Sequence, residues 1–154
     1  MVELKEDMAY KHAPMISPAM FRKYMAPCYR RLIDFLKSRG VDIVFVDCDG
    51  YPGGLIPEWI ETGIDGISPV EIAAGCNVLE IRKEYPRLAM WGGLDKRVLA
   101  GNREDVYKEV MSKVPAMLER GGFIPHIDHA IPADAILDNY IYFRELMEKA
   151  VHGL

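Results

Sequence analysis

The sequence predicts an α/β fold in which parallel strands alternate with helices through one domain, residues 1–154. Short apolar runs, several of them rich in β-branched residues, recur five times. Segments with apolar residues at helical spacing lie between them, and the connections are short. No internal repeat, linker or low-complexity segment interrupts this order. Such alternation is typical of a parallel sheet with helices packed on it.

The five strands are expected at residues 2–7, 42–47, 64–68 and 87–91, and in the run that follows Gly121 and Gly122. Lys5 weakens the pattern of the first strand. The apolar core of residues 42–47 is typical of a strand buried on both sides. We expect Pro69 to stop the third strand, and Gly92-Gly93 to end the fourth.

The first helix is expected from Ser17, as N-cap, and Pro18 to Gly40, with a kink at Pro27. Further helices are expected at residues 57–62, 70–84, 103–119 and 133–151. Gly63 should close the second helix, and Gly75 is a weak point of the third. Pro115 should perturb the last turn of the fourth.

Composition argues against several classes of protein. Of 154 residues, 50% are hydrophobic and 27% are charged, which is ordinary for a globular domain. The net charge of −4 and the lack of a basic block argue against a nucleic-acid partner. No apolar run approaches the roughly 20 residues of a membrane span, and the N-terminus lacks a signal-peptide core. Three cysteines without CxxC spacing suggest a reduced, cytoplasmic protein.

Functional side chains follow every predicted strand. In chain order they are Glu6 and Asp7; Asp47, Cys48 and Asp49; Ser68 and Glu71; Gly92, Gly93 and Asp95; Asp128 and His129. Taken singly, each of them is better explained as a turn or cap residue than as a functional one. However, the C-terminal ends of parallel strands meet at one edge, where such folds bind ligands. The recurrence at all five ends therefore predicts a site.

Individual candidates keep two interpretations. His129, beside Asp128, can act as acid, base or ligand, or can hold the turn as a structural histidine. Cys48, between Asp47 and Asp49, can bind a metal or be a buried core cysteine. The pairs Gly92-Gly93 and Gly53-Gly54 allow close approach of a ligand, but a tight turn explains them as well.

In combination, several motifs resemble the uroporphyrinogen decarboxylase superfamily, which also includes corrinoid-dependent methyltransferases. The matching stretches begin at Glu6, Ile16, Pro27, Asp47, Gly92 and Gly121, and include Asp47-Cys-Asp-Gly50, Gly92-Gly-Leu-Asp-Lys96 and Asp128-His129. The resemblance covers essentially the whole chain and indicates an uncharacterised branch related to the methyltransferases. It implies a (β/α)8 barrel, of which the five strands are the C-terminal part.

The resemblance assigns roles residue by residue. His129 stands at the family histidine, and Asp7-Met8 stands near the family's Asp-Ser, so the serine is absent. Where the methyltransferases carry a His-x-Cys zinc pair, this chain reads Val46-Asp47-Cys48, so the cysteine matches and the histidine is lost. Their later zinc cysteine falls at about His129. The family's arginine-bearing N-terminal segment and catalytic aspartate have no counterpart, so the domain is expected to be incomplete at its N-terminal side.

Three functions follow as expectations. The first is decarboxylation of porphyrinogen side chains in porphyrin biosynthesis, which needs no cofactor. Its catalytic residues are His129, Asp128 and Asp7, and its substrate-binding residues are Glu6, Asp47, Asp49, Glu71, Gly92, Gly93 and Asp95. The second is corrinoid-dependent methyl transfer with zinc at Cys48 and His129. The third is a non-catalytic fragment or binding module. The acidic strand ends would repel an anionic porphyrinogen.

The half-built barrel carries an expectation of its own. Five strands cannot close a barrel that needs eight, and an open sheet exposes unpaired edges and an apolar face. The chain is therefore expected to self-associate as a homo-oligomer or to be the C-terminal part of a longer protein. Light scattering on the isolated chain tests this, because a folded monomer at micromolar concentration would contradict it.

Overall fold

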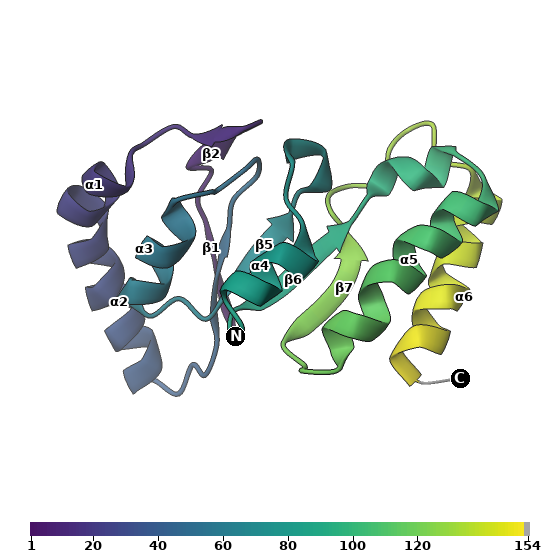
Figure 1. Ribbon diagram of the computed structural model, residues 1–154. Helices are drawn as coiled ribbons and strands as arrows, with labels where there is room; N and C mark the ends of the chain where they lie inside the picture. Colours follow the sequence, from purple (N-terminus) through teal and green to yellow (C-terminus); the bar gives the residue numbers. More distant parts are fainter. Residues whose placement is uncertain (153–154) are drawn as a thin grey trace.

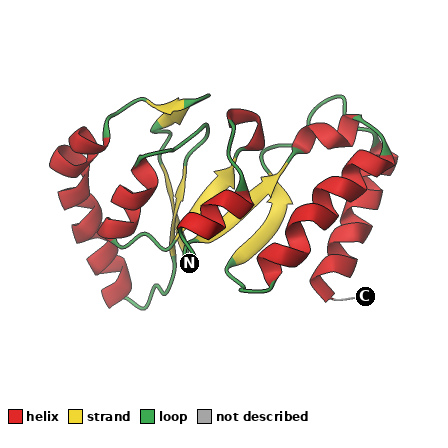
Figure 2. Cartoon of the chain, in the orientation of Figure 1, coloured by secondary structure: helices red, strands yellow, loops and turns green. Residues whose placement is uncertain are grey.

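A computed structural model describes residues 1–152, and its centre is one parallel sheet of five strands (Figures 1 and 2). The strands are β1 (Val2–Lys5), β4 (Val44–Asp47), β5 (Gly66–Val70), β6 (Ala89–Leu94) and β7 (Phe123–Ile127). They lie side by side in chain order, and every pair is parallel. Sequential parallel strands joined by helices are the arrangement of part of a (β/α)8 barrel, as predicted.

Helices lie between the strands in sequence and cover the sheet. Figure 1 shows α2 and α3 at one end of the sheet, α4 across its middle, and α5 and α6 at the other end. Their bounds are α2 (Ala26–Ser38), α3 (Leu55–Thr62), α4 (Val78–Glu84), α5 (Arg103–Leu118) and α6 (Leu137–His152). None of these helices, within residues 1–152, has the length and apolar character needed to cross a membrane.

The first helical segment begins where the sequence predicts and is irregular directly before Pro27. Ser17 caps α1 (Pro18–Met20), its Oγ accepting a hydrogen bond of 3.1 Å from the Met20 N–H. A π-helical turn, η1 (Phe21–Met25), then precedes α2. Pro27 has no N–H for the regular helical ladder, which accounts for an irregular turn directly before it.

Two predicted helices have different bounds in the structure. The expected helix at residues 70–84 is broken into a 3-10 turn, η2 (Ile72–Ala74), and α4. Gly75 lies between them with φ +98°, and Asn77 caps α4 by accepting from the Leu79 N–H. The final helix was expected from residue 133, but α6 begins at Leu137. The segment after Pro132 is a turn, so that prediction was wrong.

The glycine pair at residues 92 and 93 does not end its strand, because β6 continues to Leu94. Both glycines have positive φ, +102° and +78°. A Cβ at Gly93 would clash with Cγ1 of Val78 on α4, and one at Gly92 would lie 3.1 Å from the Pro69 backbone. These glycines let the neighbouring chain approach closely. Pro69 likewise lies inside β5 and does not stop it.

The sheet has two faces of different chemistry. The outer face, which the helices cover, holds the core, and Val44, Val46 and Met90 are fully buried there. The inner face lies on the opposite side and carries Glu3, Lys5, Asp47 and Trp91 among its side chains. Phe45, also on the inner face, stacks over Gly66, which explains why β4 is buried on both sides up to Asp47. β1 and β7 are the two edges.

A short hairpin and a 3-10 turn complete the edge where the parallel strands end. The hairpin of β2 (Ala9–Tyr10) and β3 (Ala13–Pro14) follows β1, and η3 (Lys96–Ala100) follows β6. In Figure 1 the arrows of β5, β6 and β7 point toward this edge, at the top of the view. The sequence did not predict the hairpin, since its strands are only two residues long.

Candidate functional site

The inner face is hollowed near the C-terminal ends of the strands. This inner cavity has a volume of about 280 Å³ and is lined by Glu3, Lys5, Asp47, Ser68, Pro69, Trp91, Gly92, His126, Ile127, His129 and Ala130. All five strands of the sheet contribute lining residues to this cavity. The predicted meeting of strand ends is therefore present.

A charged network forms one wall of the inner cavity. Lys5 and Asp47 are register partners on β1 and β4, and the Lys5 Nζ lies 2.5 Å from Asp47 Oδ2 and 2.9 Å from Glu3 Oε2. Ser68 Oγ donates to Glu3 Oε1 at 2.8 Å. Hydrogen bonds to Asp47 and Glu3 raise the pKa of Lys5. Burial alone would raise the pKa of Glu3, but the hydrogen bonds from Lys5 and Ser68 lower it. The wall is thus an ammonium between two carboxylates.

His129 stands at the mouth of the inner cavity. Its acidic partner is Asp49 and not Asp128, its neighbour in the sequence. Its Nε2 lies 3.3 Å from Oδ2 of Asp49, and both side chains are 45% exposed. Asp49 follows β4, whereas His129 follows β7. The fold has brought together two residues 80 positions apart in the sequence.

A second hollow, the rim cavity, adjoins this pair on the side of the β2–β3 hairpin. Its volume is about 620 Å³, and it is lined by Asp7, Ala9, Tyr10, Lys11, His12, Met15, Asp49, Gly50, Glu71, Ala73 and Ala74. Asp7 accepts from the Asp49 N–H at 3.1 Å, and Glu71 accepts from the Gly50 N–H at 2.9 Å. Two carboxylates therefore hold the loop that carries Asp49.

Asp128, predicted to line the ligand site as a catalytic residue, does not do so. Its side chain is 0% exposed. One carboxylate oxygen accepts from the Ile72 and Ala73 N–H groups at 2.7 and 3.4 Å, and the other accepts from the Lys96 N–H at 3.1 Å. The Lys96 Nζ lies 3.9 Å away. Asp128 thus holds η2 and η3 onto the end of β7 and cannot touch a ligand in either cavity.

Three of the predicted substrate-binding residues also lie outside both cavities. Asp95 caps η3 and pairs with Arg97. Burial would raise the pKa of Asp95, but the Arg97 hydrogen bonds and charge lower it. Glu6 lies beside Tyr29, whose pKa is raised by burial and by the Glu6 charge. Gly93 packs against α4. Their roles are structural because each is directed toward a helix or a turn.

The residues proposed for zinc do not form a metal site. Cys48 is 5% exposed, and burial raises the pKa of its thiol to about 11, so it is a protonated core cysteine at neutral pH. Its Sγ donates to the Asp49 carbonyl. Within residues 1–152 no group of three or more His, Cys, Asp or Glu side chains is placed to hold a metal ion. Of the two interpretations of Cys48, the buried core cysteine fits this geometry.

Several site residues were missed in the sequence. Lys5 and Glu3 lie inside the first strand, and Trp91 and His126 lie inside β6 and β7. Strand alternation could have found Glu3 and Lys5, because both are charged and stand two positions apart. Lys96, which contacts Glu71 at 3.4 Å, was quoted only as part of a motif.

The inner cavity, with charged side chains in one wall, lies at the C-terminal ends of sequential parallel strands, where (β/α)8 barrels carry their ligand sites. The chain matches the family model described as "Uroporphyrinogen decarboxylase (URO-D)" over residues 6–150. The chain therefore belongs to the uroporphyrinogen decarboxylase family.

Two curated relatives bear the name "Uroporphyrinogen decarboxylase". One, from Hydrogenobaculum sp. (strain Y04AAS1), is 28% identical over 98 residues, which are 64% of this chain and 27% of that protein. The other, from Hordeum vulgare, is 25% identical over 138 residues, 87% of this chain and 40% of that protein. The matched part thus spans well under half the length of either relative.

Proposed function

We propose that the chain acts in the decarboxylation of a tetrapyrrole and that the inner cavity receives the part of the substrate that carries the departing carboxylate. The observation that carries the proposal is the contact between His129 and Asp49 at the mouth of a cavity in a member of this family. This contact pairs an imidazole, which can deliver a proton, with a carboxylate that can orient its ring.

The charged wall suggests how a tetrapyrrole is held. The carboxylates of such a substrate need a cation, and the Lys5 side chain, 71% exposed, offers an ammonium at the cavity wall. Pyrrole N–H groups are donors and need acceptors, which Asp47 can supply. The acidic residues that would repel substrate carboxylates therefore have a use against the pyrrole rings.

The chemistry requires one proton donor. When a carboxylate leaves as CO2, the electron pair of the broken C–C bond stays on the methylene carbon, which must then be protonated. His129 is the proton donor in this proposal. Because Nε2 contacts Asp49, the proposal assigns the proton transfer to Nδ1, the second ring nitrogen. General acid catalysis of this kind contributes about 100-fold or more to a rate.

Binding and turnover are tested separately on the chain. Uroporphyrin, the oxidised and stable analogue, is titrated while Trp91 fluorescence in the inner cavity is followed, with Trp91→Phe as the optical control. Uroporphyrinogen turnover is then measured anaerobically by chromatography of the products. Lys5→Met should weaken uroporphyrin binding, whereas His129→Gln should retain binding and lower turnover about 100-fold.

His152→Gln is the matched control, because His152 lies on α6 away from both cavities. It should leave binding and turnover at their wild-type values. Binding without turnover in the wild-type chain would contradict the catalytic part and leave a binding module. No uroporphyrin binding at all would overturn the proposal.

A further inference from the structure

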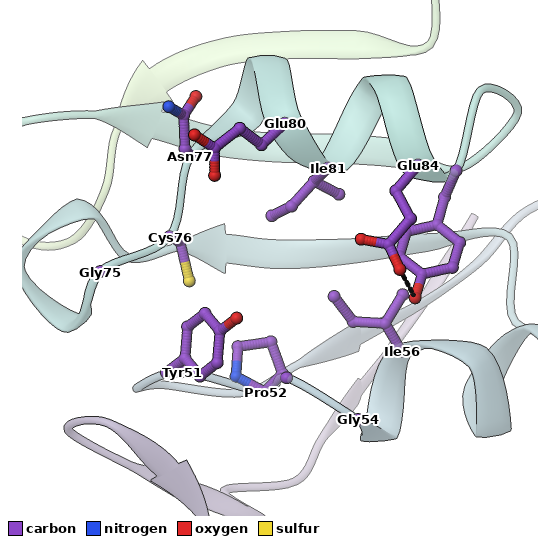
Figure 3. Close-up of a pocket in the computed structure, with 12 residues that line it drawn as sticks. Tyr51, Pro52, Gly54, Ile56, Gly75, Cys76, Asn77, Glu80, Ile81 and Glu84 are labelled. Atoms are coloured by element: carbon purple, nitrogen blue, oxygen red, sulfur yellow. Dashed lines mark hydrogen bonds between the residues drawn. The ribbon is translucent and has the colours of Figure 1, made fainter.

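A third hollow lies outside the family site, between the loop after β4 and helix α4 (Figure 3). This helix cleft has a volume of about 300 Å³ and shares no lining residue with the inner or rim cavity. Its size is at the lower end of small-molecule sites. A ligand bound here would therefore be small and independent of the proposed substrate.

Two carboxylates mark the α4 side of the helix cleft. Glu80 and Glu84 stand four positions apart on α4, so they share one helix face and are separated by about 6 Å along the axis. In Figure 3 Glu80 lies at one end of the cleft and Glu84 at the other, with Ile81 between them. Neither forms an ion pair with a basic side chain in residues 1–152.

The remaining walls combine aromatic and apolar side chains with Asn77 and exposed backbone. Tyr51 and Pro52 lie across from α4 in Figure 3, and Ile56 closes the lower side. The Tyr85 hydroxyl donates to Glu84 Oε1 at 2.8 Å, which holds the second ring at the Glu84 end. Burial and Glu84 raise the pKa of Tyr85 to about 12, so this hydroxyl remains a donor. Among the lining residues, all of which lie in the described part of the chain, none is Lys, Arg or His.

We propose that the helix cleft binds a short aliphatic diamine in its doubly protonated form. Each ammonium meets one carboxylate, and the methylene chain between them lies against Ile81 and Pro52. The faces of Tyr51 and Tyr85 add cation–π attraction, which aromatic rings offer to ammonium groups. A four-carbon chain is chosen because its nitrogen atoms are separated by about the rise of one helical turn, which also separates positions 80 and 84 along α4.

Alternative ligands fit less well. A monoamine would leave one carboxylate without a partner, and an anion would meet two carboxylates and no cation. A neutral diol of the same length would fill the same volume without any charge. Comparing these molecules therefore isolates the charge of the ligand from its size and shape.

Titration calorimetry on the chain tests the proposal with 1,4-diaminobutane, butylamine and 1,4-butanediol. The diamine should bind most tightly, butylamine more weakly, and the diol without detectable heat. Glu80→Gln and Glu84→Gln should each weaken diamine binding at least about threefold, the effect of a partly exposed ion pair. Tyr51→Ala should weaken it too, whereas Tyr51→Phe should not.

Glu148→Gln on α6 removes the same charge from an exposed site outside the cleft and should bind the diamine like the wild type. Circular dichroism of each variant checks that it is folded. Equal heats for the diamine and the diol, or wild-type binding by both Glu80→Gln and Glu84→Gln, would overturn the proposal. So would an equal loss in Glu148→Gln, because binding would then follow net charge alone.

Discussion

The outer and inner faces of the sheet are built from alternate residues of the same strands, yet they differ in almost every property. On β6, Met90 is fully buried under the helices, whereas its neighbour Trp91 lines the inner cavity. On β4, Val46 is fully buried in the core, and Asp47 pairs with Lys5 on the cavity side. Successive side chains of a strand point to opposite faces. The comparison indicates that the outer face provides stability, whereas the inner face carries the charged groups of the cavity wall.

Truncation of one apolar residue on each face tests this division and has the largest expected effect. Met90→Ala leaves a void in the helix-covered core and should lower the free energy of unfolding by about 3 kcal/mol. Ile124 is the register partner of Trp91 on β7 and is 45% exposed, so Ile124→Ala should cost about 1 kcal/mol or less. Urea unfolding followed by circular dichroism measures both. Equal losses of unfolding free energy would mean that the two faces contribute equally to stability.

The second comparison concerns two aspartates at the C-terminal ends of the strands. Asp128 accepts from three backbone N–H groups in a buried site, whereas Asp49 is half-exposed beside His129. Asp128→Asn presents an amide donor to some of these N–H groups and should cost about 2 kcal/mol of stability. Asp49→Asn should change stability by less than about 0.5 kcal/mol and act on turnover instead. Thermal unfolding of the two variants, run in parallel, gives the ranking; the reverse order would refute it.

The thiols provide the smallest effect and separate a core cysteine from a surface one. Cys28 is exposed, whereas Cys48 and Cys76 are buried and have pKa values raised by burial to about 11 and about 12. At pH 8 a thiol reagent should modify Cys28 at least about 100-fold faster than the other two. Unfolding in urea should release all three. Rapid reaction of Cys48 in the folded chain would contradict its burial and would be consistent with an accessible metal ligand.

The raised pKa values of Cys48 and Cys76 predict how the free energy of unfolding changes with pH. A raised folded pKa means that the unfolded chain loses the proton first, from about pH 9, the unperturbed value for these thiols. Stability from these groups is therefore fully present below pH 9 and falls as the pH rises toward 11 and 12. Cys48→Ala should flatten the lower part of this fall in unfolding experiments run between pH 8 and pH 11. An unchanged slope would contradict burial of the thiol.

Local pattern was sufficient for the order of elements and for the family. The apolar runs, the Ser17 cap and the Gly63 stop each depend on neighbours within a few residues, so the sequence alone predicted five strands in the right order. The same reasoning failed at Gly92 and Gly93. These glycines look like a strand end in sequence, but contacts with Pro69 and Val78 from other elements place them inside β6.

The roles of the polar residues were decided only by the tertiary structure. Sequence adjacency paired His129 with Asp128, but β7 ends so that Asp128 turns inward to the N–H groups of η2 and η3. The loop after β4 brings Asp49 to His129 in its place, across 80 residues of sequence. Composition and spacing can therefore identify which residue types gather at the C-terminal ends of the strands. Which carboxylate is buried by backbone donors, and which faces a cavity, depends on long-range packing that no local pattern encodes.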